Sequence, residues 1–147
     1  MAGLRRALAG FWLAPVAPGV LLWAAFAPLD LGWLQPLGWG LLLVSVRLRE
    51  GRLAGRQAFV AGLVLYVPGF AWIAPLVAGG WIFTAVWSAL FEALFGALLA
   101  RTYLRRPAAL RGALWVAGAG ALHLAVDALR GFLLSGFPWL LPGYAGW

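Results

Sequence analysis

The sequence contains no cysteine and no lysine, since all eleven of its basic residues are arginine. The absence of cysteine excludes disulfides, thiolate metal sites and a thiol nucleophile. Acidic residues number only four, and there is a single histidine. The sequence also lacks a glycine-rich phosphate loop and a serine within a Gly-x-Ser-x-Gly turn. We therefore expect no cofactor, and these residues do not indicate small-molecule catalysis.

Charged residues make up only 10% of the chain, whereas 65% is hydrophobic and the mean hydropathy is +0.94. So little polar surface cannot cover a water-soluble globule. A bilayer core about 30 Å thick takes roughly 20 apolar residues per helical span. The sequence therefore predicts an all-α membrane protein with about five transmembrane helices. The predicted spans are residues 7–29, 31–46, 57–74, 81–103 and 112–130, followed by an outer loop at 131–147.

The formal net charge of +7 comes from arginines that lie in short clusters between the apolar runs. They do not form one basic face, so no nucleic-acid partner is expected. With five spans, every arginine except Arg130 falls on the same side of the membrane. By the positive-inside rule, that side and the N-terminus are cytoplasmic. The loops around Asp30 and Gly79 and the C-terminal loop then lie on the periplasmic side.

Glu92 falls near the middle of the fourth predicted span, where an ionisable group costs at least ~2.5 kcal/mol and must face the bundle interior or a cavity. Small residues surround it at helical spacing, which lets another helix approach closely. These are Ala85, Ser88, Ala89 and Gly96. One interpretation is a neutral, hydrogen-bonded packing residue, and the other is a role in transport or catalysis. We favour the first, because no series of proton-relay residues accompanies Glu92.

His123 and Asp127 are four residues apart in the fifth predicted span, and Arg130 follows on the same helical face. One interpretation is a catalytic dyad. The other, which we favour, is that Asp127 pairs with Arg130 near the outer interface and that His123 is a buried partner of Asp127. His123 is also a candidate partner of Glu92, since the two lie at similar depths in their spans. No metal site is expected, because one His and one Asp are too few ligands.

Two segments resemble those of a known family. Residues 25–31 read Ala-Phe-Ala-Pro-Leu-Asp-Leu, and residues 127–139 read Asp-Ala-Leu-Arg-Gly-Phe-Leu-Leu-Ser-Gly-Phe-Pro-Trp, with Gly143-Tyr144 following. The first resembles the Phe-x-Pro-x-Asp turn after the first span of bacterial apolipoprotein N-acyltransferases. The second is more specific and resembles their Glu-x-Leu-Arg-Gly-x-x-x-(Thr/Ser)-Gly-Phe-Pro-Trp segment, with Asp127 where the family usually has Glu. The likeness covers this whole chain but only the first part of such an enzyme.

Enzymes of this family move an acyl chain from a phospholipid to the amino terminus of a lipoprotein, through a thioester on a cysteine. The resemblance implies a bacterial inner-membrane location and phospholipid as a partner, with a lipoprotein or a separate nitrilase-like domain as further candidate partners. It also implies residues that face lipid or substrate at the end of the fifth span and in the outer loop. These candidates are Asp127, Arg130, Gly136, Phe137, Pro138, Trp139 and Tyr144.

The catalytic Glu-Lys-Cys triad of the family lies in a periplasmic nitrilase-like domain, and this sequence has neither the cysteine nor the lysine. We therefore expect a truncated or stand-alone membrane domain of an apolipoprotein N-acyltransferase, which binds lipid and has no catalytic residues of its own. Whether the chain is itself an enzyme stays open at this point. The alternative function is a small multi-pass transporter or a membrane scaffold subunit with Glu92 at its centre.

Overall fold

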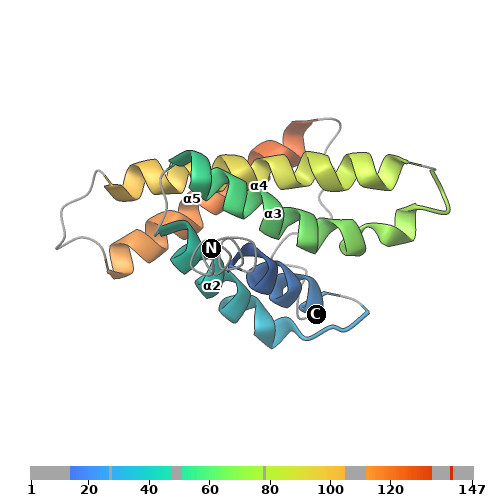
Figure 1. The fold of residues 1–147 in the computed structure, drawn as a ribbon, viewed down its shortest axis with the longest axis horizontal. Helices are drawn as coiled ribbons and strands as arrows, with labels where there is room; N and C mark the ends of the chain where they lie inside the picture. Colours follow the sequence, from blue (N-terminus) through green and yellow to red (C-terminus); the bar gives the residue numbers. More distant parts are fainter. Residues whose placement is uncertain are drawn as a thin grey trace, which may run out of the picture.

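The computed structural model describes residues 14–26, 28–47, 51–77, 79–104, 112–133 and 140. Every regular element within these ranges is helical, as the sequence predicts (Figure 1). In chain order the helices are Ala14–Ala24, η1 (Gly32–Leu34), α2 (Gln35–Arg47), α3 (Gly51–Gly69), η2 (Ala71–Ile73), α4 (Gly80–Leu104) and α5 (Ala113–Phe132). The segment Ala14–Ala24 is called the first helix below.

The helices α3 and α4 form an antiparallel hairpin along the length of the bundle (Figure 1). Glycine and alanine line their contact, so the two backbones approach closely. A Cβ atom built on Gly96 would lie 2.6 Å from the Ala58 Cβ and 2.8 Å from the Ala54 carbonyl oxygen. One built on Gly62 would lie 3.1 Å from the Ala89 Cα. The close packing of this hairpin therefore depends on small residues at these positions.

The first helix and α2 pack against each other, and the first helix also packs against α3. A Cβ atom on Gly38 of α2 would lie 2.8 Å from the Leu22 Cγ of the first helix. A Cβ atom on Gly19 would lie 2.6 Å from the carbonyl oxygen of Ala61 in α3. The three helices thus meet at glycines, as helices in a lipid environment commonly do.

The helix α5 packs on α4 and presents an apolar surface on its other side. The buried apolar residues in this part of the core are Phe95 and Leu99 of α4 and Trp115, Ala119 and Val126 of α5. Large apolar side chains of α5 point outward, since Leu114 is 61% exposed, Leu124 67% and Phe132 86%. Exposed apolar surface of this extent is typical of contact with lipid or with another protein.

The observed α3 differs from the predicted third span at both ends. It runs from Gly51 to Gly69, whereas the predicted span is residues 57–74. Arg52 and Arg56 lie within its first two turns with exposed side chains. Arginine is a good helix former, so these charges interrupt an apolar run without interrupting the helix.

The first predicted span, 7–29, also differs from the observed helix, whereas the second, 31–46, agrees with the apolar helix Gly32–Val46. The first helix ends at Ala24, and a turn follows in which Asp30 has a φ of 54°. This left-handed conformation is one that Asp adopts more readily than most residues. The part of the first predicted span before residue 14 lies outside the described residues.

Of the helices that the structure describes, one is long and apolar enough to cross a bilayer by itself. It is the segment Gly80–Thr102 of α4, with a mean hydropathy of 1.8. Ala14–Ala24 and Gly32–Val46 are shorter apolar helices. The all-helical fold is therefore confirmed for the described residues, and the number of five spans remains a prediction. Of the predicted outer loop, residues 134–139 and 141–147 lie outside the described residues.

Candidate functional site

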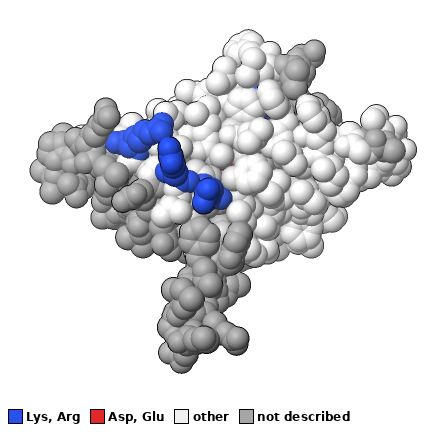
Figure 2. Space-filling view, turned by 45° about the horizontal axis from the view of Figure 1, so that its top comes forward, with Lys and Arg blue, Asp and Glu red and all other residues white. Residues whose placement is uncertain are grey.

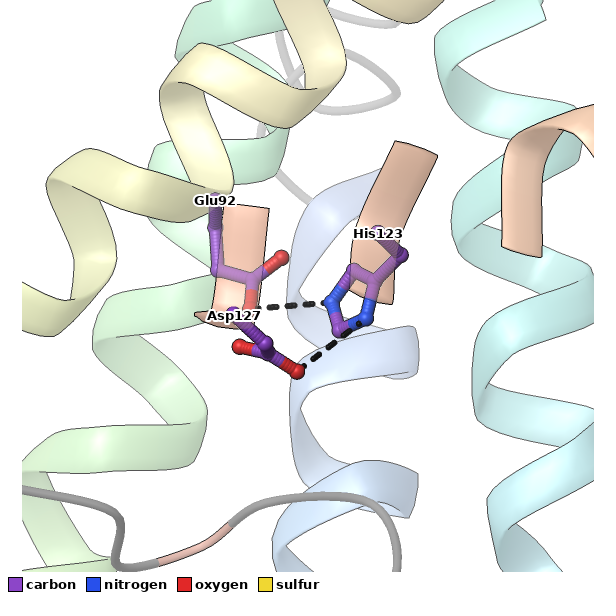
Figure 3. Close-up of side chains that lie close together, drawn as sticks. All are labelled: Glu92, His123 and Asp127. Atoms are coloured by element: carbon purple, nitrogen blue, oxygen red, sulfur yellow. Dashed lines mark hydrogen bonds and ion pairs between the residues drawn. The ribbon is translucent and has the colours of Figure 1, made fainter. Parts of the chain in front are cut away.

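Ionisable and hydroxyl side chains meet in the interior between α3, α4 and α5. The group consists of Tyr66 from α3, Glu92 from α4, and His123, Asp127 and Arg130 from α5, and we call it the polar cluster. Each member is at most 8% exposed. Figure 3 shows the side chains of Glu92, His123 and Asp127 converging from two helices. Polar groups buried at this depth require partners, because an unsatisfied one is costly away from water.

The helix α5 supplies three members because of their spacing along one helical face. The Nδ1 atom of His123 lies 3.3 Å from Oδ2 of Asp127, one turn further along (Figure 3). The Nη2 atom of Arg130 lies 3.3 Å from Oδ1 of the same carboxylate. Both pairs follow from the helical periodicity that the sequence shows. The predicted pairing of Asp127 with Arg130 and with His123 is therefore confirmed.

Three further contacts join the helices to one another. The Nε2 atom of His123 lies 3.4 Å from Oε1 of Glu92, which confirms that these two side chains meet. The Tyr66 hydroxyl donates a hydrogen bond of 3.0 Å to the same Oε1 atom. The Nη1 atom of Arg130 donates a hydrogen bond of 2.7 Å to the Tyr66 oxygen. The contacts form a closed ring that runs from Glu92 through His123, Asp127, Arg130 and Tyr66 back to Glu92.

Aromatic rings hold the His123 imidazole in place from the sides. The Trp39 ring of α2 lies edge-on to it at a centroid distance of 4.1 Å, and the Phe95 ring of α4 does so at 4.9 Å. The Arg130 guanidinium carbon lies 5.1 Å from the centre of the Tyr66 ring, within reach of a cation–π contact. Side chains from α2, α3, α4 and α5 therefore contribute to one site.

The charges in the polar cluster can balance one another. Both ring nitrogens of His123 face a carboxylate oxygen, so an imidazolium would donate a hydrogen bond to Glu92 and form an ion pair with Asp127. With that imidazolium, two carboxylates face two cations, one of them Arg130, and the net charge of the cluster is zero. A group whose charges cancel is the kind of ionisable cluster that a membrane interior tolerates. Its chemistry is therefore suited to fixing helices in place.

The polar cluster also contains donor atoms that could surround a metal ion. One donor atom each from Glu92, His123 and Asp127 lies within 4.8 Å of the others. The sequence supplies the His and the Asp on one helix, and the fold adds the Glu as a third donor. Arg130 already provides a cation beside the Asp127 carboxylate. A metal ion would have to bind against this positive charge, so the expectation of no metal site stays our prediction.

Tyr66 is the cluster member that the sequence did not reveal. It stands within an apolar run, and its partners Glu92 and Arg130 are 26 and 64 residues away along the chain. The sequence indicated Tyr66 only weakly. A tyrosine hydroxyl within a predicted span needs a hydrogen-bond partner, and few polar side chains in the other spans could supply one. Only the three-dimensional arrangement shows which of them it meets.

The candidates for contact with lipid or substrate divide into two groups. The side chains of Asp127 and Arg130 are 9% and 2% exposed and are engaged in the polar cluster. Any effect that they have on a lipid would therefore act through the position of α5. The remaining candidates lie outside the described residues and are Gly136, Phe137, Pro138, Trp139 and Tyr144.

The variant Glu92→Gln should melt close to the wild-type temperature, because the glutamine carbonyl oxygen can still accept from Tyr66 and from a neutral His123, and Asp127 then balances the charge of Arg130. Glu92→Leu removes this acceptor and leaves two buried donors unpaired, at about 1–3 kcal/mol each. Thermal unfolding in detergent, followed by tryptophan emission, compares the two variants with wild type. An equal loss in both would mean that the cluster needs the negative charge of Glu92 and not only its acceptor atom.

Comparison with known proteins shows a consistent similarity. The family model of the apolipoprotein N-acyltransferase N-terminal domain matches residues 18–147. The apolipoprotein N-acyltransferase of Azotobacter vinelandii is 37% identical over 144 residues, which cover 90% of this chain and 27% of that protein. The Vibrio cholerae protein of the same name is 32% identical over 144 residues, covering 90% of this chain and 28% of the relative. This chain therefore spans little more than a quarter of the length of these relatives.

Proposed function

The chain belongs to the apolipoprotein N-acyltransferase family, and on this basis we propose that its residues form the lipid-binding membrane part of such an enzyme. The observation that carries the proposal is the polar cluster at the end of α5. Arg130 is 2% exposed and contacts both Asp127 and Tyr66, two residues before the end of that helix at Phe132. The cluster thus fixes the end of α5, and we propose that the Gly-Phe-Pro-Trp segment, which follows in the sequence, borders the lipid.

We further propose that the chain crosses a bacterial inner membrane about five times. The apolar length of α4 and the exposed apolar side chains of α4 and α5 support membrane embedding. The turn between the first helix and η1 and the turn between α3 and α4 lie at one end of the bundle (Figure 1). The exposed Arg52, Arg56 and Arg101 belong to the start of α3 and the end of α4, at the other end. By the positive-inside rule, the arginine end is cytoplasmic.

Cysteine labelling tests this orientation without background, because the natural chain has no cysteine. In intact spheroplasts, Leu76→Cys should react with a membrane-impermeant maleimide and Gly112→Cys should not. Both positions are exposed in the structure, Leu76 at 72%, so protection would reflect the membrane and not burial in the protein. After lysis, Gly112→Cys should react as well. The reverse pattern in intact spheroplasts would overturn the orientation.

The proposed role is binding of phospholipid and not the transfer step. A thioester route needs a thiolate nucleophile, a base that activates it and a donor or cation that stabilises the oxyanion. These 147 residues contain neither cysteine nor lysine. The buried Glu92, His123 and Asp127 contact one another and Tyr66 or Arg130, and the structure describes no serine or threonine hydroxyl bonded to them. The nucleophile of the reaction would therefore come from outside these residues.

The test uses the purified 147-residue chain with phospholipid and a diacylated lipoprotein acceptor. We expect no acyl transfer above a protein-free control. A phospholipid with a photoactivatable acyl chain should crosslink to the chain, and excess unlabelled phospholipid should compete. Acyl transfer by this chain alone would overturn the proposed division of roles. Crosslinking that cannot be saturated would overturn the lipid-binding role.

A further inference from the structure

A groove of about 520 Å³ lies between α3 and α4, away from the polar cluster. Its floor is made of small residues, among them Gly55 of α3 and Ala93 and Ala97 of α4. Larger apolar side chains form its walls, with Phe59 on α3 and Leu90 and Leu94 on α4. The groove exists because the close approach of the two helices, through residues such as Gly55, leaves no side chain to fill the space between these walls.

One end of the groove is strongly basic. Arg52 and Arg56, one helical turn apart on α3, line the groove and are exposed. Arg101 of α4 reaches the same end, since its Cγ lies 3.6 Å from the place where a Cβ on Gly51 would be. Figure 2 shows basic side chains gathered on one region of the surface, with no acidic side chain of a described residue visible in that view.

The arginines at this end have no acidic partner within the part of the chain that the structure describes. The carboxylates of Glu92 and Asp127 are buried and paired within the polar cluster. Asp30 lies in the turn after the first helix, at the opposite end of the bundle from the start of α3 (Figure 1). The groove therefore combines an apolar trough with a cluster of guanidinium groups whose charge is not matched by a described residue.

We infer that this groove binds an anionic phospholipid, with an acyl chain in the trough and the phosphate held between Arg52, Arg56 and Arg101. Guanidinium groups bind phosphate through paired hydrogen bonds, and a pair of them spaced one turn apart can contact one headgroup. Basic pockets between transmembrane helices on the cytoplasmic side commonly bind anionic lipids.

Charge favours this occupant over the alternatives. A second copy of the chain docked on the same face would bring two sets of arginines together, and their repulsion opposes such a dimer. A zwitterionic lipid carries an additional cation in its headgroup, and Arg101 would repel that cation. The groove is also separate from the segment after α5 that we propose borders lipid, since only residues of α3 and α4 line the groove. The inference depends on the proposed membrane embedding but not on any role in acyl transfer.

The first test measures binding of phosphatidylglycerol and phosphatidylcholine to the delipidated full chain in detergent, by native mass spectrometry. Wild type should bind phosphatidylglycerol more tightly. The double variant Arg52→Gln/Arg56→Gln should bind it about 10- to 30-fold more weakly, at about 1 kcal/mol per arginine. Its affinity for phosphatidylcholine should not change. The matched variant Arg52→Lys/Arg56→Lys keeps both charges and should lose less than the Gln variant.

The second test concerns the trough. Ala97→Phe places a large side chain in the groove, whereas Ala121→Phe makes the same change at an exposed position of α5. Phosphatidylglycerol binding should fall in the first variant and not in the second.

Equal binding of the two lipids by wild type, or unchanged phosphatidylglycerol binding in the Gln double variant, would overturn the inference. If inorganic phosphate displaces phosphatidylglycerol but Ala97→Phe still binds it, the groove is an anion site without an acyl-chain site. If crosslinking through this face gives dimers, the occupant is a second copy of the chain. Failure of the chain to float with liposomes would instead contradict the proposed membrane embedding.

Discussion

Replacing Arg130 by methionine should destabilise the protein by about 3–5 kcal/mol, the usual cost of removing one partner from a buried ion pair. Methionine keeps much of the apolar stem of arginine, so the loss reports mainly the guanidinium group. The Asp127 carboxylate would lose its 3.3 Å contact with Nη2, and the Tyr66 hydroxyl would lose its 2.7 Å donor. Arg130 is 2% exposed, so water cannot replace these contacts. The measurement is reversible unfolding in mixed micelles, followed by tryptophan emission.

Arg56→Met makes the same chemical change at an exposed position and should alter stability by no more than about 0.5 kcal/mol. Adding Asp127→Asn to Arg130→Met should cost less than the sum of the two single changes, because the unpaired carboxylate is then absent. Additive effects, or an Arg130→Met protein that unfolds like wild type, would mean that the ring of contacts does not stabilise the bundle.

Gly96→Leu is expected to cost about 3 kcal/mol, in the upper part of the usual range for overpacking. Even the first carbon of the new side chain would lie 2.6 Å from the Ala58 Cβ and 2.8 Å from the Ala54 carbonyl oxygen. The second of these is a backbone atom of α3, which cannot move aside without moving the helix. The two central helices would therefore have to separate. Unfolding in mixed micelles measures the loss, and a reduced yield of folded protein should accompany it.

The matched control is Gly120→Leu on α5, where an added Cβ meets no other atom within 4 Å. Leucine is the better helix former, so this variant should be neutral or more stable by up to about 1 kcal/mol. If both glycine variants lost stability to the same extent, the cause would be a general effect of leucine and not the contact between α3 and α4.

The sequence was sufficient for those features that depend on local periodicity. Uncharged runs indicated the helices, and spacings of three and four residues indicated the contacts of Asp127 with Arg130 and His123. The meeting of Glu92 with His123 followed from similar depths in two spans. The start of α3 at Gly51 was not predicted. The uncharged run begins only after Arg56, but the helix itself includes Arg52 and Arg56.

Other features depend on how distant segments are arranged, which periodicity does not contain. Tyr66 meets Glu92 and Arg130 only because α3 lies against α4 and α5 also packs on α4. The arginine-lined groove similarly requires the start of α3 beside the end of α4, and no spacing within either helix predicts it. The family resemblance gave the identity of the chain but assigned no role to Glu92 or Tyr66.

The closed ring of contacts has a consequence for the register of α5. Two of its links, from His123 to Glu92 and from Arg130 to Tyr66, join α5 to α4 and α3 at points about two turns apart along α5. A slide of α5 by one turn, about 5.4 Å, would break both links at once, and a rotation of α5 about its axis would do the same. The other contacts of the ring lie within α5 or between α3 and α4, so these two links are the ones that fix the register of α5. The last turns of α5 should therefore occupy one register only, and hydrogen exchange of their backbone amides should occur together with that of α3 and α4 in a single opening event.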